Sequence, residues 1–288
     1  MYHPSNFLYL LLLPIIGFGQ STALPKVSIA DTEVREIASH HVQSMDYEIH
    51  IALPRQYVSS DQNYPVVYYL DAYYWGATII ETYRLLRAFN EIPPLILVGI
   101  SYKDATRAEA TFNRSRDFIP TEITSKNMGK WANSPPAASG GAEQFLQFIK
   151  EELMPLINQN YRTNPNDTGI LGYSYGGLFA TYVLFRDPST FSKYLIGSPY
   201  LAHDEFQTIR AEKEYFASNK SLNAKVFLSI GMDEWEPHML SWMYLKNLLQ
   251  GRNYEGLKLI VKSFEGENHT SNIPGTMSRA LRELYKRE

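Results

Sequence analysis

The sequence predicts an α/β fold: a mostly parallel central sheet with helices on both faces and an antiparallel hairpin at its N-terminal edge. Continuous apolar runs at residues 64–71 and 94–102 are typical of strands that are buried on both faces. Segments with helical periodicity separate such runs, which favours parallel pairing under covering helices. Within residues 33–57 apolar side chains alternate with polar ones, which predicts the hairpin; they are Tyr47, Ile49, Ile51 and Leu53.

The other elements continue this order along the chain. Helical periodicity covers residues 76–90 and 142–161, and Pro155 predicts a kink in the second helix. Residues 103–141 are polar and rich in turn formers, so we expect a long loop that acts as a lid or a binding loop. The rest of the chain predicts strands that end at Ser174 and cover 194–198, 224–231 and 257–264, and helices at 176–186, 203–217, 237–250 and 272–286.

The N-terminus has the pattern of a secretory signal peptide. An apolar run over residues 7–18 is shorter than the roughly 20 residues of a membrane span. Small residues, Gly17 and Gly19, precede a candidate cleavage point before Gln20. We therefore expect residues 1–19 to be removed, a single domain over residues 20–288, and an exported protein, periplasmic or secreted, without a stable membrane span.

Composition narrows the function classes. The chain has 288 residues, a net charge of -3 and no cysteine. The missing cysteines exclude disulfides, thiolate chemistry and cysteine-ligated zinc. No lysine- or arginine-rich run occurs, which argues against nucleic acid as a partner. The composition leaves the oligomeric state open.

A glycine-bracketed serine stands between a predicted strand and a predicted helix. Residues 172–176 read Gly-Tyr-Ser-Tyr-Gly, the G-x-S-x-G pattern of a nucleophile on a sharp strand-to-helix turn. The glycines at 172 and 176 are expected because the strand and helix pass closely there, and a side chain at either position would clash. The pattern makes Ser174 a candidate nucleophile.

Partners for this serine follow later strands in a fixed order. Ligands of open α/β sheets gather at the carboxyl ends of the strands. After the strand at 224–231 comes an acidic loop in which Glu234 is favoured, with Asp233 and Glu236 left open, and after the strand at 257–264 comes His269. The order serine, acid, histidine is that of an α/β-hydrolase. His238 is a minor alternative to His269 as the base.

These residue types suit acyl transfer. A serine hydroxyl is a weak nucleophile that needs an adjacent base, and histidine titrates nearest to neutral pH. A carboxylate then fixes the imidazole tautomer. Backbone N–H groups of Tyr175, directly after the serine, and of Tyr73, with Ala72 as the alternative to Tyr73, would bind the oxyanion. Such chemistry requires no metal or organic cofactor, and its partner is a small-molecule ester.

Several segments together resemble the esterase family that includes esterase D, the enterobactin esterase-like siderophore hydrolases and some feruloyl and acetylxylan esterases. The segments are YPVVYYLDAYYW, NRSRDFIP, SGGAEQFLQFIKEELMPLINQNYRT, ILGYSYGGLFATYVLF and IGSPYL, and the resemblance covers roughly residues 33–286. It implies an α/β-hydrolase fold with Ser174 as nucleophile, Glu234 as acid and His269 as base. The siderophore hydrolases are the most similar branch.

The resemblance also implies a substrate class and candidate contacts. It suggests an ester or lactone of a siderophore, with feruloyl or acetylxylan esters as the second choice and acyl transfer or simple binding as further alternatives. Arg114 and Arg116 would hold an anionic ligand, or else form surface ion pairs. The chain departs from the family at Tyr173, commonly histidine, and Ala72, commonly glycine. Other expected substrate contacts are aromatic: Tyr74, Trp75, Tyr173 and Trp235.

Overall fold

The computed structural model describes residues 28–126, 138–204 and 206–286. The predicted signal peptide and part of the predicted loop at 103–141 lie outside these residues. Asp31–Glu288 forms one compact unit by its internal contacts. Among the described helices, none is both long enough and apolar enough to cross a membrane.

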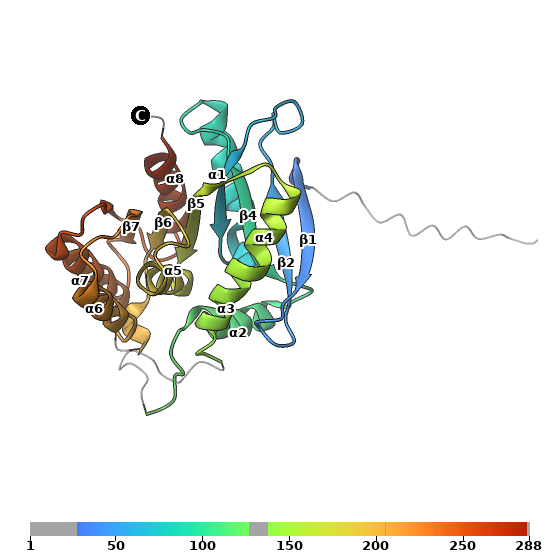
Figure 1. The fold of residues 1–288 in the computed structure, drawn as a ribbon. Coiled ribbons are helices and arrows are strands. Elements are labelled where there is room, and N and C mark those ends of the chain that lie inside the picture. The colour runs from blue at the N-terminus through green and yellow to red at the C-terminus, as the bar shows by residue number, and fades with distance from the viewer. Residues whose placement is uncertain (1–27, 127–137, 205, 287–288) are drawn as a thin grey trace, which may run out of the picture. The chain divides into compact units, whose positions relative to one another are not determined.

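The described strands form one eight-stranded sheet in the order β1-β2-β4-β3-β5-β6-β7-β8 (Figure 1). The β1–β2 and β2–β4 pairs are antiparallel, and every later pair is parallel. This confirms the predicted fold class and its N-terminal hairpin. The strands are β1 Thr32–Ala38, β2 Asp46–Ala52, β3 Tyr64–Tyr69, β4 Ile96–Tyr102, β5 Thr163–Tyr173, β6 Lys193–Gly197, β7 Lys225–Gly231 and β8 Lys258–Phe264.

Helices cover both faces of this sheet. Helices α1 and α8 contact each other on one face, whereas α5 contacts α2 and α6 on the other (Figure 1). The helices are α1 Ala72–Ala88, α2 Arg107–Phe118, α3 Ala142–Gln147, the π-helical η1 Phe148–Leu153, α4 Met154–Asn160, α5 Tyr175–Arg186, the short 3₁₀ helix η2 Leu201–Asp204, α6 Thr208–Ser218, α7 Glu236–Arg252 and α8 Asn272–Tyr285.

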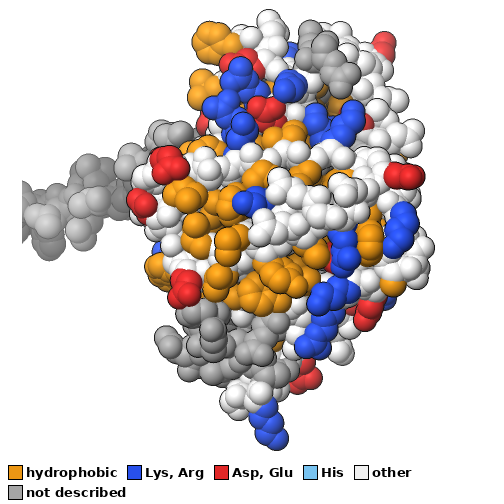
Figure 2. All heavy atoms as spheres, turned by 90° about the vertical axis from the view of Figure 1, so that its left-hand side faces the viewer, with side chains coloured by type: hydrophobic (Ala, Val, Ile, Leu, Met, Phe, Trp, Pro, Cys, Tyr) orange, Lys and Arg blue, Asp and Glu red, His pale blue; other side chains and the backbone are white. Residues whose placement is uncertain are grey.

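The central strands carry the apolar runs because both of their faces are covered. Every residue of β4 is buried, as a strand between two helical layers requires. The edge strand β8 differs, since none of its residues is fully buried and Lys258 and Lys262 are exposed. Figure 2 looks at the molecule from the left-hand side of Figure 1, where α6 and α7 lie, and shows hydrophobic side chains flanked by lysine and arginine. Charged side chains on an edge strand discourage pairing with another chain.

One prediction for the region after β4 is wrong. Residues 103–141 were expected to be an irregular loop, but α2 occupies Arg107–Phe118. The helix begins with a capping box in which the Thr106 hydroxyl accepts from the Glu109 N–H and the Glu109 carboxylate accepts from the Thr106 N–H. The buried face of α2 has few apolar side chains, so the hydrophobic periodicity of the helix is weak. The Thr-x-x-Glu spacing was the sequence signal that could have indicated its start.

The helix predicted at 142–161 is present but not uniform. It passes from α3 through the π-helical η1 into α4. Pro155 lies in the first turn of α4. The departure from α-helical geometry therefore lies in the turns before the proline, consistent with the missing N–H and the ring clash that proline causes.

The glycines around Ser174 are required to different degrees. A Cβ at Gly172 would lie 2.0 Å from the Gly176 carbonyl oxygen, and a Cβ at Gly177 would lie 2.7 Å from the Gly197 carbonyl oxygen. At Gly176 the nearest atom would be 3.4 Å away, at Asp71, which is ordinary contact. The predicted clash is confirmed at residue 172 and wrong at residue 176, because the helix turns its third residue, not its second, towards the neighbouring strand β6.

Alanine substitutions separate these positions. We expect Gly172→Ala and Gly177→Ala to lower the free energy of unfolding by about 1–3 kcal/mol, because backbone atoms must move aside. Gly176→Ala is the matched control and should cost less than about 1 kcal/mol, since the helix gains a better helix former. Urea unfolding measures the three values, and equal losses at all three positions would contradict the packing described.

Candidate active site

Ser174 lies at the carboxyl end of β5 in a strained turn. Its φ of 60° and ψ of -116° are rare for a residue with a side chain. The turn is held by backbone bonds: Ser174 N–H donates to Gly197 O at 3.0 Å, and Ser174 O accepts from Leu178 N–H at 3.0 Å and from Tyr200 N–H at 3.3 Å. Ser174 itself is half-buried. The chain thus holds a serine at the tip of a sharp strand-to-helix turn.

Two neighbouring strand ends also carry residues with positive φ. Asp71 follows β3 with φ 57°, and Ser198 follows β6 with φ 41°. Strands β3, β5 and β6 are adjacent and parallel, so these residues lie along the same edge of the sheet as Ser174. Strained backbone of this kind gathers at functional sites, where surrounding contacts hold it in place.

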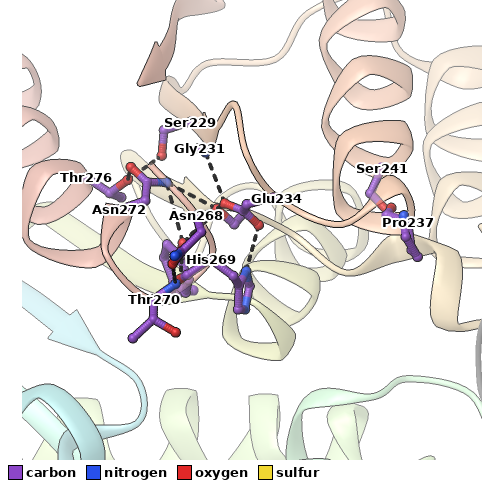
Figure 3. A network of polar contacts seen from close by, with 12 residues as sticks. Ser229, Gly231, Glu234, Pro237, Ser241, Asn268, His269, Thr270, Asn272 and Thr276 are labelled. Carbon is purple, nitrogen blue, oxygen red and sulfur yellow. Dashed lines mark hydrogen bonds and ion pairs between the residues drawn. The ribbon is translucent and has the colours of Figure 1, made fainter. Parts of the chain in front are cut away.

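The acid that reaches His269 is Glu234. Its Oε2 lies 2.6 Å from His269 Nδ1, and its side chain has no exposed surface (Figure 3). Because a carboxylate only accepts hydrogen bonds, the proton of this bond lies on Nδ1 and Nε2 is left as the basic nitrogen. The neighbouring candidates Asp233 and Glu236 are both exposed. The structure therefore pairs the favoured acid with the favoured histidine.

The other oxygen of Glu234 is held by the ends of two strands. Oε1 accepts from the Ser198 hydroxyl and, at 3.0 Å, from the Gly231 N–H. Burial raises the pKa of the Glu234 carboxyl, but the bonds from His269, Ser198 and Gly231 outweigh it and leave the pKa below its ordinary value. The carboxylate is therefore charged at neutral pH and fixed in orientation.

The Tyr173 side chain contacts both Glu234 and His269. It is 1% exposed, and its hydroxyl donates to the His269 carbonyl oxygen at 2.8 Å. The side-chain amide of Asn272 donates to the Ser198 hydroxyl at 3.3 Å and lies 3.4 Å from the Tyr173 hydroxyl. Burial raises the pKa of Tyr173 and keeps it a neutral donor. The sequence predicted a substrate contact for Tyr173. Because the side chain is buried and bonds the backbone of His269, it instead holds the loop that carries His269.

Backbone donors for an oxyanion stand in the first turns of two helices. Tyr175 opens α5, and Ala72 and Tyr73 open α1, after the adjacent strands β5 and β3. The first N–H groups of a helix have no partner within the helix. In α1 the N–H groups of Tyr74 and Trp75 donate to Asp71 O at 2.9 and 3.2 Å, which leaves those of Ala72 and Tyr73 without a bond inside that helix.

The two candidate arginines are held by aspartates. Arg114 donates two hydrogen bonds to the buried Asp71, at 2.7 and 2.9 Å. Arg116 donates to the buried Asp117 at 2.7 Å. The ion pair was the alternative for both residues, and it is what the structure contains. The Arg114–Asp71 pair also fastens α2 to the loop that begins α1.

The predicted aromatic contacts differ in exposure. Trp235 is 73% exposed and Tyr73 41% exposed. Tyr74 and Trp75 are half-buried, and their rings pack against each other with centroids 5.4 Å apart. These four side chains belong to the chain segments that carry the proposed oxyanion donor and the acid, so aromatic surface lies on those segments.

His238, near the start of α7, is buried next to His269. Its ring stacks on Tyr200 with a centroid distance of 4.6 Å, and lies 4.2 Å from the His269 ring. Burial, with the neighbouring His269, lowers the pKa of His238 to about 4, so it is uncharged at neutral pH. No acid orients it by a hydrogen bond among the described residues, which disfavours His238 as the base. With Glu234 and His269 it forms the one described group that could hold a metal ion.

Ser198 and Asn272 are site residues that sequence reasoning missed. Both are fully buried and bind the Glu234–Tyr173 network. Ser198 had a usable signal, because it ends a predicted strand at the carboxyl edge of the sheet where ligands gather. Asn272 had no such signal in the sequence, because it stands at an ordinary helix start and its hydrogen-bond partners come from distant segments.

Removing the charge of Glu234 should destabilise the fold in a pH-dependent way. We expect Glu234→Gln to lower the free energy of unfolding at pH 7 by about 1–3 kcal/mol, because buried donors lose a charged acceptor. The folded pKa lies below the ordinary value of 4.5, so this contribution is present above that pH and is lost as the pH falls through the folded pKa.

Urea unfolding between pH 7 and pH 3 checks the effect, with Asp233→Asn as the matched control. The exposed Asp233 should change the free energy of unfolding by less than about 0.5 kcal/mol. A loss at Asp233 equal to that at Glu234, or a Glu234→Gln effect that grows as the pH falls, would contradict the arrangement described.

Comparison with known proteins shows the family of the chain. The Esterase family model, described as "Putative esterase", matches residues 41–236. The ferri-bacillibactin esterase of Bacillus subtilis is 31% identical over 263 residues, which cover 88% of this chain and 90% of that protein. The siderophore triacetylfusarinine C esterase of Aspergillus fumigatus is 25% identical, over 77% of this chain and 82% of that protein.

A solved structure extends the likeness to the fold. The BES protein from Bacillus cereus superposes with a TM-score of 0.81 and 29% identity, over 91% of this chain and 99% of that one. The family expected from the sequence segments is therefore confirmed. The chain belongs to this esterase family and is a carboxylic ester hydrolase.

Proposed function

We propose that the chain is a serine esterase in which Ser174 is the nucleophile, His269 the general base and Glu234 the orienting acid. The observation that carries the proposal is the buried Glu234–His269 hydrogen bond of 2.6 Å, which stands at the same sheet edge as the strained Ser174 turn. A histidine fixed through Nδ1 presents its basic Nε2 for proton transfer.

The proposed reaction has two stages. In the first, the Ser174 hydroxyl attacks the ester carbonyl while His269 accepts its proton, and the alcohol leaves with that proton as the acyl-enzyme forms. In the second, His269 activates water, which releases the acid and restores Ser174. Among the described residues no hydrogen bond joins Ser174 to His269, and bonds between a nucleophile and its base commonly tighten when substrate binds.

The oxyanion of each tetrahedral intermediate is proposed to bind the N–H groups of Tyr175 and Tyr73, with Ala72 as the alternative to Tyr73. Helix N-termini carry partial positive charge, so both donors suit a developing negative oxygen. One such donor can contribute roughly 3 kcal/mol to stabilisation of the transition state. Because these donors belong to the backbone, the alanine that replaces the family's glycine at residue 72 still offers its N–H.

Replacement of the nucleophile should stop turnover without unfolding the protein. We expect Ser174→Ala to lower kcat for a p-nitrophenyl short-chain ester by at least about 1,000-fold, because no acyl-enzyme can form. The absorbance of released p-nitrophenol under steady-state conditions measures kcat, and urea unfolding checks the fold.

The exposed Ser59 supplies the matched control, since Ser59→Ala should keep wild-type kcat. A fluorophosphonate probe should label the wild type and the Ser59 variant but not the Ser174 variant. Undiminished turnover or labelling of Ser174→Ala would contradict the assignment.

We further propose that the substrate is an ester or lactone of a siderophore. The relatives named above are esterases of ferri-bacillibactin and of triacetylfusarinine C. Aromatic side chains beside the site, with Trp235 the most exposed, suit a flat aromatic acyl group. The ion-paired Arg114 and Arg116 are not retained as ligands of an anionic group.

A panel of esters tests the substrate class. We expect kcat/KM for a catecholate trilactone to exceed that for methyl ferulate and for acetylated xylan by at least about tenfold, a difference of about 1.4 kcal/mol in transition-state stabilisation. Chromatography of the released acids gives the rates. A higher kcat/KM for methyl ferulate or acetylated xylan would support the carbohydrate-esterase alternative, and preferential transfer of the acyl group to an added alcohol would support an acyltransferase.

Export is part of the same proposal. The apolar run at residues 7–18 and the small residues Gly17 and Gly19 support cleavage before Gln20. A periplasmic or secreted esterase would meet siderophore esters outside the cytoplasm.

A further inference from the structure

Three potential metal ligands meet at the sheet edge that also carries the proposed nucleophile. Glu234, His238 and His269 each offer one ligand atom, and these atoms all lie within 4.8 Å of one another. They come from the loop after β7, the first turns of α7 and the loop after β8. Figure 3 shows the Glu234 and His269 side chains pointing towards each other, with Pro237, the residue before His238, at the start of the neighbouring helix.

The ring nitrogens of the buried His238 have no hydrogen-bond partner among the described residues. His238 is only 3% exposed. Tyr200 covers one part of its ring at 4.6 Å and His269 packs at 4.2 Å. A buried polar group without a partner lowers stability, and a ligand for its nitrogen removes that cost. Neither the proposed acyl transfer nor the packing requires a histidine at this position.

The donor types select a class of ion. Two imidazoles and one carboxylate form a ligand set of zinc sites, whereas Mg²⁺ and Ca²⁺ prefer oxygen ligands. Zinc bonds of about 2.0–2.2 Å place ligand atoms roughly 3.3 Å apart in a tetrahedron, so the three groups need only small side-chain rotations to close on an ion. His269 is 30% exposed on its side chain and gives an ion access from solvent.

We propose that Glu234, His238 and His269 form a binding site for Zn²⁺ or a similar divalent cation, and that occupation of this site inhibits the esterase. The cation takes the place of the proton between Glu234 and His269, and that proton moves to Nε2 of His269. Because Nε2 then carries a proton, His269 cannot accept the proton of Ser174. The inhibition rests on the proposed serine mechanism, whereas the binding does not.

Binding is tested on the Ser174→Ala variant, which keeps the three ligands. We expect calorimetric titration with Zn²⁺ to show a saturable site, His238→Phe in this background to weaken it at least about tenfold, and Mg²⁺ to give no binding. Phenylalanine keeps a ring against Tyr200 and His269, and thermal unfolding checks the fold. A visible absorption band on Co²⁺ titration of the wild type, abolished by Zn²⁺, tests the site without any substitution.

The matched control is His41, whose Nε2 lies 3.0 Å from Glu151 on the surface. His41→Phe should leave zinc binding unchanged. Absence of zinc binding, binding that His238→Phe does not weaken, or binding lost instead in His41→Phe would overturn the site.

Inhibition is tested by hydrolysis of a p-nitrophenyl ester at controlled free Zn²⁺, each protein being compared with its own zinc-free rate. The wild type should be inhibited and recover with a chelator, and the His238→Phe variant should need at least about tenfold more zinc. Activation of the wild type by zinc, or equal inhibition of both proteins, would overturn the inhibitory role. If zinc binds as expected but Ser174→Ala retains turnover, the serine mechanism fails and the metal site stands.

Discussion

The buried carboxylate of Glu234 is the group around which the site is arranged. A charge without solvent contact must be matched by donors, and its donors come from His269, Ser198 and the backbone of Gly231. These donors end or follow three consecutive parallel strands, β6, β7 and β8. One charge therefore fixes the relative positions of separate loops, and the histidine is held in a single tautomer as a result.

Strain and close packing complete the arrangement. Ser174, Asp71 and Ser198 adopt backbone conformations that are unfavourable for residues with side chains. Each is held by neighbours: Ser174 by the bond to Gly197, Asp71 by Arg114 and Ser198 by Glu234. The cost of each conformation is offset by contacts from another segment of the chain, so the turn at Ser174 is held in place by the fold itself.

The sequence predicted the elements well because buried strands and amphipathic helices leave local periodic signals. The pairing of His269 with Glu234 was favoured but not decided, since Asp233, Glu234 and Glu236 share one short loop and only its path shows which side chain turns inward. For Arg114 the sequence left an anionic ligand and an ion pair open, because its partner, Asp71, is far away in sequence and local sequence does not show which distant carboxylate a side chain will meet. Helix α2 was missed because its apolar face is sparse.

The site also has an order of assembly. The residues of the site are spread along the chain from Asp71 to Asn272. The site is therefore complete only after the parallel strands have paired. During synthesis the turn around Ser174 emerges before β7 and β8, and the proposed base emerges only after β8. Parallel pairing between distant segments is slow to form. A nascent chain therefore carries its proposed nucleophile for a period without its proposed base, and the proposed site is complete only when the C-terminal strand docks.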